Sequence, residues 1–215
     1  IRDKEVSRGT VSIKQAVEEA MTMMGKIKEG GEIDWISTGI TPLDTILLGM
    51  QPGQLIILGG RPGAGKSAMA SQIASHVAMA EKHSSLLISL EMQRIEFARR
   101  MIAAKEAVNS KLMKNLVELT DWQVQSIANA AGEVATGRLM IDDTPGQTIS
   151  QIVANARRWK RKDNLGFLVV DYIQKVYEPA GRNENRTTVV GRVSGALKDL
   201  AKELSIPILG LAQLN

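Results

Sequence analysis

The chain has 215 residues and a mass of 23.3 kDa, which is enough for one α/β domain with an appendage but not for two large domains. Its hydrophobic fraction of 44% and charged fraction of 23% are those of a folded protein, and its net charge of +4 suits a polyanionic partner without requiring one. The absence of cysteine excludes disulfides, thiolate metal sites and cysteine nucleophiles and is compatible with a reducing cytoplasm, and no apolar stretch approaches the ~20 residues that cross a bilayer.

The first predicted element is an amphipathic helix over Thr10–Lys28, which the glycine pair at residues 30 and 31 would end. Such a helix needs a surface to cover, and two surfaces remain open: its own domain or a neighbouring subunit. We therefore expect residues 1–31 to form a linker and residues 32–215 to form a separate domain. The apolar side chains that recur at three- and four-residue steps are Ile13, Val17, Ala20, Met24 and Ile27.

From Gln54 onward, short apolar runs alternate with helical stretches. The runs are apolar at consecutive positions, as expected for strands of a parallel sheet that is covered on both faces. Capping boxes at Thr120–Gln123 and Thr148–Gln151 predict two helix starts, and Trp122 and Trp159 are expected to pack on these helices. The alternation predicts a three-layer α/β fold with a mostly parallel sheet. The predicted strands are Leu55–Leu58, Leu86–Leu90, Leu139–Ile141, Phe167–Val170 and Ile206–Leu211.

A phosphate-binding loop lies between the first strand and a helix predicted to run to about Lys82. Its glycines let backbone N–H groups point at phosphate oxygens, and the helix N-terminus adds partial positive charge. Lys66 would neutralise the β- and γ-phosphate oxygens, and the Ser67 hydroxyl would bind Mg²⁺. This segment is therefore predicted to bind the phosphates of ATP. The segment is Gly60-Arg61-Pro62-Gly63-Ala64-Gly65-Lys66-Ser67. Ala68, the next residue of the predicted helix, is also expected to contact the nucleotide.

Three further polar residues follow predicted strands. Asp171 closes an apolar run at the carboxyl edge of the sheet, where ligands of open α/β folds bind, and would be the second anchor of Mg²⁺. Glu91 would reach the same edge and is a candidate for activating the attacking water, although a solvated glutamate is an open alternative. Gln213 ends the last strand, where its amide is a candidate sensor of the γ-phosphate.

The segment Tyr177–Thr188 contains turn formers and no apolar anchor, which predicts a mobile loop near the same edge. Its arginines, Arg182 and Arg186, are candidates for sequence-independent contacts with DNA phosphates, but a plain surface loop explains them equally well. Base stacking is disfavoured because aromatic residues make up only 3% of the chain.

The segment Asp142–Gly146 also follows a predicted strand. Its two acids are compatible with a metal site, but a turn capped by aspartate is the favoured interpretation because Asp side chains readily accept hydrogen bonds from the backbone two residues on.

Together these segments resemble the C-terminal motor domain of DnaB-type replicative helicases, a RecA-like branch of the P-loop ATPases. The resemblance implies that ATP and Mg²⁺ drive movement along single-stranded DNA and unwinding of duplex DNA. It places this activity in the cytoplasm of a bacterial cell, for a protein encoded either by the cell or by a phage. It also implies that Glu91 activates water, that Asp171 serves Mg²⁺, and that Gln213 couples nucleotide state to DNA-binding loops. The segments that carry it are residues 38–44, 49–53, 60–67, 89–92, 141–146, 170–174 and 211–214.

The resemblance further implies a homo-oligomer, expected to be a hexameric ring, in which the Thr10–Lys28 helix docks on the next subunit. Primase and a helicase loader are candidate partners, and an arginine finger and a further DNA-contacting loop are expected beyond Asn215. Two alternatives stay open: a RecA-like recombinase or filament-forming ATPase, and a nucleotide-gated ring scaffold with little DNA-stimulated turnover. The segments 142–146 and 170–174 favour the helicase branch over recombinases.

Overall fold

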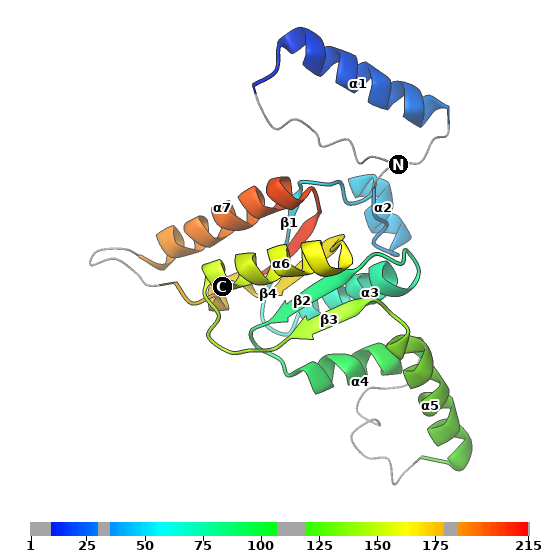
Figure 1. The fold of residues 1–215 in the computed structure, drawn as a ribbon. Helices are drawn as coiled ribbons and strands as arrows, with labels where there is room; N and C mark the ends of the chain where they lie inside the picture. The colour runs from blue at the N-terminus through cyan, green and yellow to red at the C-terminus, as the bar shows by residue number, and fades with distance from the viewer. Residues whose placement is uncertain (1–9, 30–34, 107–118, 179–184, 215) are drawn as a thin grey trace. The chain divides into compact units, whose positions relative to one another are not determined.

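The computed structural model describes residues 10–29, 35–106, 119–178 and 185–214 (Figure 1). The chain divides into two compact units, Ile1–Asp34 and Trp35–Asn215. The first unit contains helix α1, Ile13–Lys28, which begins where the Ser12 hydroxyl accepts a hydrogen bond from the Gln15 amide. The predicted amphipathic helix therefore forms, three residues shorter at its start than the sequence pattern indicates, and none of its residues is buried.

The second unit is built on a parallel five-stranded sheet in the order β1-β5-β4-β2-β3. Every predicted strand is present, with ends that differ by one or two residues. The last strand begins at Ile208 because Pro207, which has no N–H to donate, precedes it. The strands are β1, Leu55–Gly60; β2, Ser85–Ser89; β3, Leu139–Asp142; β4, Phe167–Asp171; and β5, Ile208–Gln213.

Helices connect these strands, and both predicted capping boxes form, at the starts of α5 and α6. Trp159 packs against the core as expected, but Trp122 is 76% exposed, because α5 packs on α4 rather than on the sheet. In the part of the chain that the structure describes, no helix has the length and apolar character of a membrane span. The helices are α2, Thr41–Leu47; α3, Lys66–Met79; α4, Arg94–Lys105; α5, Asp121–Ala135; α6, Ile149–Asp163; the 3-10 helix η3, Ile173–Lys175; and α7, Arg186–Leu204.

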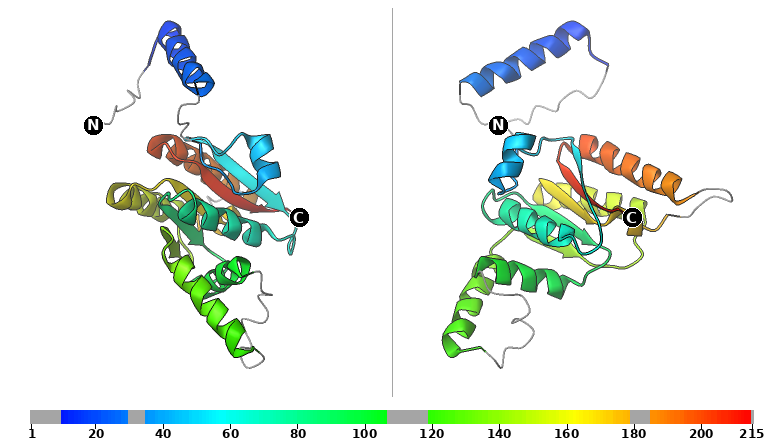
Figure 2. Two further views of the ribbon diagram at one scale, coloured as in Figure 1. Left: turned by 90° about the vertical axis from the view of Figure 1, so that its right-hand side faces the viewer. Right: turned by 180° about the vertical axis from the view of Figure 1, so that it is seen from behind.

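The core consists of two apolar clusters, one on each face of the sheet. Alternate strand residues face opposite ways: Leu86 and Ile88 pack with α6 and α7, whereas Leu87 packs with α3 and Phe97 of α4. Figure 2 shows α3 and α7 on opposite sides of the sheet. The predicted three-layer α/β architecture is thus confirmed, and the carboxyl ends of all strands lie at one edge.

Candidate nucleotide-binding site

The loop between β1 and α3 has the backbone of a phosphate cradle. Gly60 ends β1, residues 61–65 form the loop, and residues 66–68 open α3. Gly63 and Gly65 have φ angles of 75° and 88°, a left-handed region that glycine adopts without steric cost. No side chain caps α3, whose N-cap is Gly65, so its first N–H groups remain available to an anion.

Lys66 folds back over this loop. Its ammonium Nζ donates hydrogen bonds to the carbonyls of Gly60, at 2.8 Å, and Arg61, at 3.0 Å. A Cβ on Gly60 would lie 3.3 Å from Lys66 Cγ, so only glycine leaves this space open without displacing the lysine. Because a lysine has three N–H donors, one remains for a phosphate oxygen. The positive charge is therefore held in place before a ligand arrives.

Asp171 is the buried acid of the site. It ends β4, its relative exposure is 1%, and its strand register pairs it with Ser89 of β2. The Ser67 hydroxyl hydrogen-bonds its carboxyl group, but among the described residues the Oδ2 atom has no partner. Buried carboxylate oxygens normally have partners, so this atom calls for a ligand that the described residues do not supply.

The charge environment of Asp171 shows which predicted residues come together. Burial raises the pKa of this carboxyl, and the negative charge of Glu91 raises it further. The hydrogen bond from Ser67 and the positive charges of Lys66 and Arg100 act in the opposite direction without cancelling the rise. Arg100 lies on α4 and was not predicted to belong to the site. An arginine within a helix has no sequence pattern that indicates a contact with a carboxylate on a distant strand.

An oxygen-ligated cation fits these residues. Mg²⁺ is usually held by one or two carboxylates together with hydroxyl, phosphate and water oxygens rather than by a full protein cage. The unpartnered oxygen of Asp171 beside the Ser67 hydroxyl meets that description. Among the described residues there is no cluster of three or more His, Cys, Asp or Glu side chains that would form such a cage.

Glu91 lies in the turn after β2 and is exposed. The strand ends at Ser89 rather than at Leu90, and the Leu90 amide donates to the Asp171 carbonyl at 2.8 Å. Glu91 therefore stays close enough to Asp171 to affect its pKa. It also lines a cavity of about 640 Å³ together with Arg94 and other residues of the adjoining loops.

Gln213 ends β5 beside the start of the phosphate loop. Its strand register pairs it with Gly60. The side-chain amide of Gln174 bonds both backbone groups of Gln213: its Nε2 donates to the carbonyl at 3.1 Å, and its Oε1 accepts from the N–H at 3.2 Å. The sequence pattern contained Gln174 but did not reveal this role, which depends on a contact across 39 positions.

The candidate DNA-binding arginines are only partly described. Arg182 lies outside the described residues. Arg186 is the first residue of α7 and is exposed. It lines a cavity of about 430 Å³ with Tyr172 and Gln213. Arg186 is thus placed beside the end of β5.

The aspartate turn after β3 is confirmed as a structural feature. Asp142 Oδ1 accepts from the Thr144 amide at 3.0 Å, and Oδ2 accepts from the Asn155 side chain at 2.7 Å. Asp143 accepts from the Arg94 amide, at the start of α4, at 2.9 Å. The Asp142 carboxylate therefore stabilises the turn after β3, as the favoured interpretation of this segment predicted. Asp143 instead caps the start of α4, a contact with a distant segment that the sequence did not reveal.

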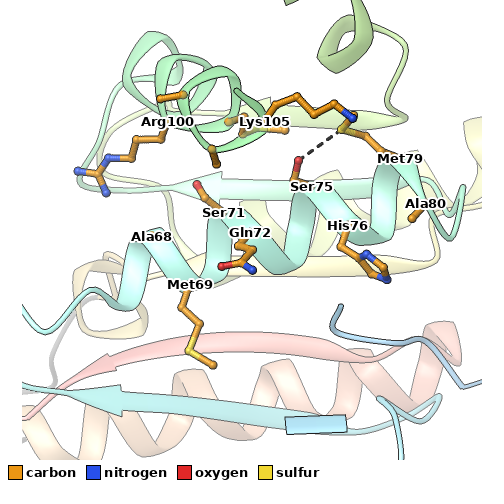
Figure 3. A pocket seen from close by; sticks show the side chains of 13 residues that line it. Ala68, Met69, Ser71, Gln72, Ser75, His76, Met79, Ala80, Arg100 and Lys105 are labelled. Carbon is orange, nitrogen blue, oxygen red and sulfur yellow. Dashed lines mark hydrogen bonds between the residues drawn. The ribbon is translucent and has the colours of Figure 1, made fainter. Parts of the chain in front are cut away.

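A further hollow of about 810 Å³ lies between α3 and α4 (Figure 3). Met69, Gln72 and His76 point to one side of α3, whereas Ser71, Ser75 and Met79 lie on the side toward α4. Among the predicted site residues that the structure describes, only Ala68 lines this hollow. It therefore adjoins the phosphate site through Ala68 and through Arg100, whose charge acts on Asp171.

Comparison with known proteins gives consistent matches. A family model, the DnaB-like helicase C terminal domain, matches residues 35–215. The replicative DNA helicase DnaC of Bacillus subtilis is 37% identical over 187 residues, which cover 86% of this chain and 40% of that protein. The chain thus spans less than half the length of this relative.

Two solved structures share the fold at 28% sequence identity. A solved ATPase domain has a TM-score of 0.85 and covers 96% of this chain and 72% of its own. The second is the structure of a DnaB-like replicative helicase and its interactions with primase, with a TM-score of 0.83. The match covers 96% of this chain and 49% of the helicase chain. The expected RecA-like ATPase fold is therefore confirmed.

Proposed function

Because this chain belongs to the DnaB-like helicase C-terminal domain family, we propose that it is the ATP-driven motor of a replicative DNA helicase, which moves along single-stranded DNA and unwinds duplex DNA. The observation that carries the proposal is the buried Asp171 carboxylate, with one unpartnered oxygen, beside the lysine and serine of the phosphate loop. In this proposal the arrangement binds a nucleotide together with its cation. Without a ligand, the buried carboxylate would only cost folding free energy, because burying an unpaired charge is unfavourable.

Residues 60–68 bind the nucleotide phosphates in this proposal. The left-handed glycines aim backbone N–H groups at the oxygens, and the uncapped start of α3 contributes its dipole. Lys66, already fixed on two loop carbonyls, neutralises the β- and γ-phosphate oxygens. Binding therefore requires little rearrangement of the loop.

Ser67 and Asp171 would hold Mg²⁺, which when bound neutralises phosphate charge as it builds up during transfer. Before binding, the Ser67 hydroxyl and the Lys66 charge partly offset the cost of the buried acid. Glu91 orients the attacking water and accepts its proton on a carboxylate oxygen, a role that its exposed position at the carboxyl edge of the sheet permits.

Gln213 couples nucleotide state to DNA in this proposal. Its backbone pairs with Gly60 on one side and with the Gln174 side chain on the other, so a shift of the phosphate loop would be passed along the end of β5. Gln213 also lines a cavity together with Arg186. Arg182 and Arg186 then contact DNA phosphates, which carry no sequence information.

Assembly and partners are proposed on the same basis. The linker over residues 1–31 places α1, whose apolar side chains are exposed in this chain, on a neighbouring subunit of a hexameric ring. Primase, with which a structural neighbour interacts, and a helicase loader are the proposed protein partners. The proposed location is the cytoplasm of a bacterial cell, because the relatives that the chain matches include bacterial replicative DNA helicases such as DnaC of Bacillus subtilis.

A Glu91→Gln variant of the whole protein tests the hydrolytic step. The amide keeps the shape and hydrogen bonds of the carboxyl but cannot accept the proton, so ATP turnover is expected to fall by about a hundredfold. ATP binding should stay close to wild type, because Glu91 is not part of the phosphate loop. Steady-state hydrolysis and equilibrium binding of a fluorescent ATP analogue measure the two effects separately.

Gln93→Ala is the matched control for this test, because Gln93 is an exposed polar residue of the same turn whose side chain makes no capping hydrogen bond to α4. It should turn over ATP at the wild-type rate. Normal turnover by Glu91→Gln would remove Glu91 from the mechanism and return it to the solvated-glutamate interpretation.

A further inference from the structure

The turn that carries Glu91 is fixed on both sides of this residue. Before it, the Leu90 amide donates to the carbonyl of Asp171 at 2.8 Å. After it, the Met92 amide donates to the Ser89 hydroxyl at 3.2 Å, and this hydroxyl donates to the Met92 carbonyl at 2.6 Å. The strand β2 thus passes into a closed turn rather than a free loop.

The next anchor comes from another part of the chain. Gln93 is the N-cap residue of α4, but its side chain makes no capping hydrogen bond. Asp143 supplies the cap instead, since its Oδ2 accepts the Arg94 amide at 2.9 Å. The Arg94 side chain adds an ion pair, with Nε 3.0 Å from Asp143 Oδ1. A carboxylate at a helix N-terminus is also favoured by the helix dipole.

The sheet register brings Asp143 to this place. Ile88 of β2 pairs with Asp142 of β3, so the residue after Asp142 lies beside the end of β2. Asp142 holds the following turn through its bonds to Thr144 and Asn155. The hydrogen bond from the Arg94 amide, opposed by partial burial and aided by the charge of Arg94, keeps the pKa of Asp143 below its usual value. Asp143 is therefore ionised at neutral pH.

We propose that Asp143 is a positioning residue for Glu91: it caps α4 from the neighbouring loop and so fixes the main-chain path on which Glu91 is presented to the attacking water. This inference rests on the proposed role of Glu91 in hydrolysis. Catalytic groups lose much of their effect when displaced by about 1 Å, and loss of the cap releases the start of α4 at Arg94, three residues after Glu91. Asp143 acts through the turn and does not itself contact the nucleotide.

Three single variants of the whole protein separate the cap from the ion pair. Asp143→Ala removes both and is expected to lower kcat for ATP about tenfold to a hundredfold, with KM changed less than about twofold. Asp143→Asn keeps an oxygen for the Arg94 amide and should recover most of kcat. Arg94→Ala removes only the ion pair, leaves the capped amide in place, and should have a kcat near that of the wild type.

Asp163→Ala is the control for stability alone. Asp163 forms an ion pair with Arg138 at 2.6 Å and accepts from the Ser84 hydroxyl at 2.7 Å, at the edge of the sheet opposite the phosphate loop. This variant should lower the Tm but keep the wild-type kcat. The two variants are then compared at equal Tm. If Asp143→Ala loses more kcat than Asp163→Ala, the extra loss comes from displacement of Glu91 and not from lower stability.

Non-additivity gives the decisive readout. In a Glu91→Gln background, Asp143→Ala should cause no further loss of kcat, because the residue that it positions is already inactive. A further tenfold loss in the double variant, or wild-type kcat in Asp143→Ala alone, would overturn the positioning role and leave the role of Glu91 intact. Normal turnover by Glu91→Gln would overturn the role of Glu91 and this inference with it.

Discussion

A Lys66→Ala variant is expected to lower ATP turnover by about a thousandfold and to weaken ATP binding as well, because it removes the one side-chain cation fixed inside the phosphate loop. The fold should remain, since Lys66 is only half-buried and its hydrogen bonds go to carbonyls of its own loop. Binding of a fluorescent ATP analogue and steady-state hydrolysis measure the two losses.

Lys198→Ala is the matched control. Its ammonium also donates to a main-chain carbonyl, that of Gly53 at 2.8 Å, but it lies on α7 and bonds to the residues that precede β1. Turnover in this variant should be normal. Equal losses in the Lys66 and Lys198 variants would show that the effect comes from the fold rather than from the phosphate site.

An Asp171→Asn variant is expected to turn over ATP about a thousandfold more slowly than the wild type. When neither protein has nucleotide or metal bound, the variant should nevertheless have the higher free energy of unfolding. Burial raises the pKa of Asp171, so its ionised form is less favourable in the folded chain than in the unfolded chain. The wild-type free energy of unfolding therefore falls as pH rises through this raised pKa, and the neutral amide removes that dependence. Thermal unfolding in EDTA at several pH values, together with hydrolysis assays in Mg²⁺, tests both parts.

Asp44→Asn provides the contrast for that experiment. Burial would raise the pKa of Asp44, but hydrogen bonds from Thr38 and Ser37 outweigh it and hold the pKa below its usual value. This variant should lose stability, with a Tm lower by about 3 °C, because it weakens satisfied hydrogen bonds. A lower Tm for Asp171→Asn as well would show that the buried charge at Asp171 is compensated within the chain, against the proposed cation site.

Local sequence patterns predicted the three layers and the phosphate loop because both features are determined by interactions between residues close together in the sequence. Apolar runs, capping boxes and the glycine spacing each act within a few residues. Strand ends were less accurate where a side chain closes a turn, as Ser89 does when it bonds Met92 and ends β2 one residue before the predicted end. The β1-β5-β4-β2-β3 order was not predictable from these patterns, since it depends on contacts between distant segments.

The parts of the site that the sequence did not reveal all depend on long-range contacts. Asp143 caps α4 across 49 positions, and Gln174 holds Gln213 across 39. Arg100 affects the pKa of Asp171 from a different helix. None of these residues has a local signature of its role. The sequence pattern did place Asp171, Glu91 and Gln213 after strands, because parallel strands bring their carboxyl ends to one edge.

The central claim, that ATP hydrolysis by this domain drives movement on DNA, is tested most directly by strand displacement on a forked duplex with the whole protein. The account predicts ATP turnover stimulated by single-stranded DNA, displacement of the paired strand with ATP and Mg²⁺, and loss of both with Glu91→Gln. A recombinase would assemble on single-stranded DNA without displacing the strand, and a ring scaffold would hydrolyse ATP at the same rate with or without DNA. Either result would contradict the proposed helicase motor.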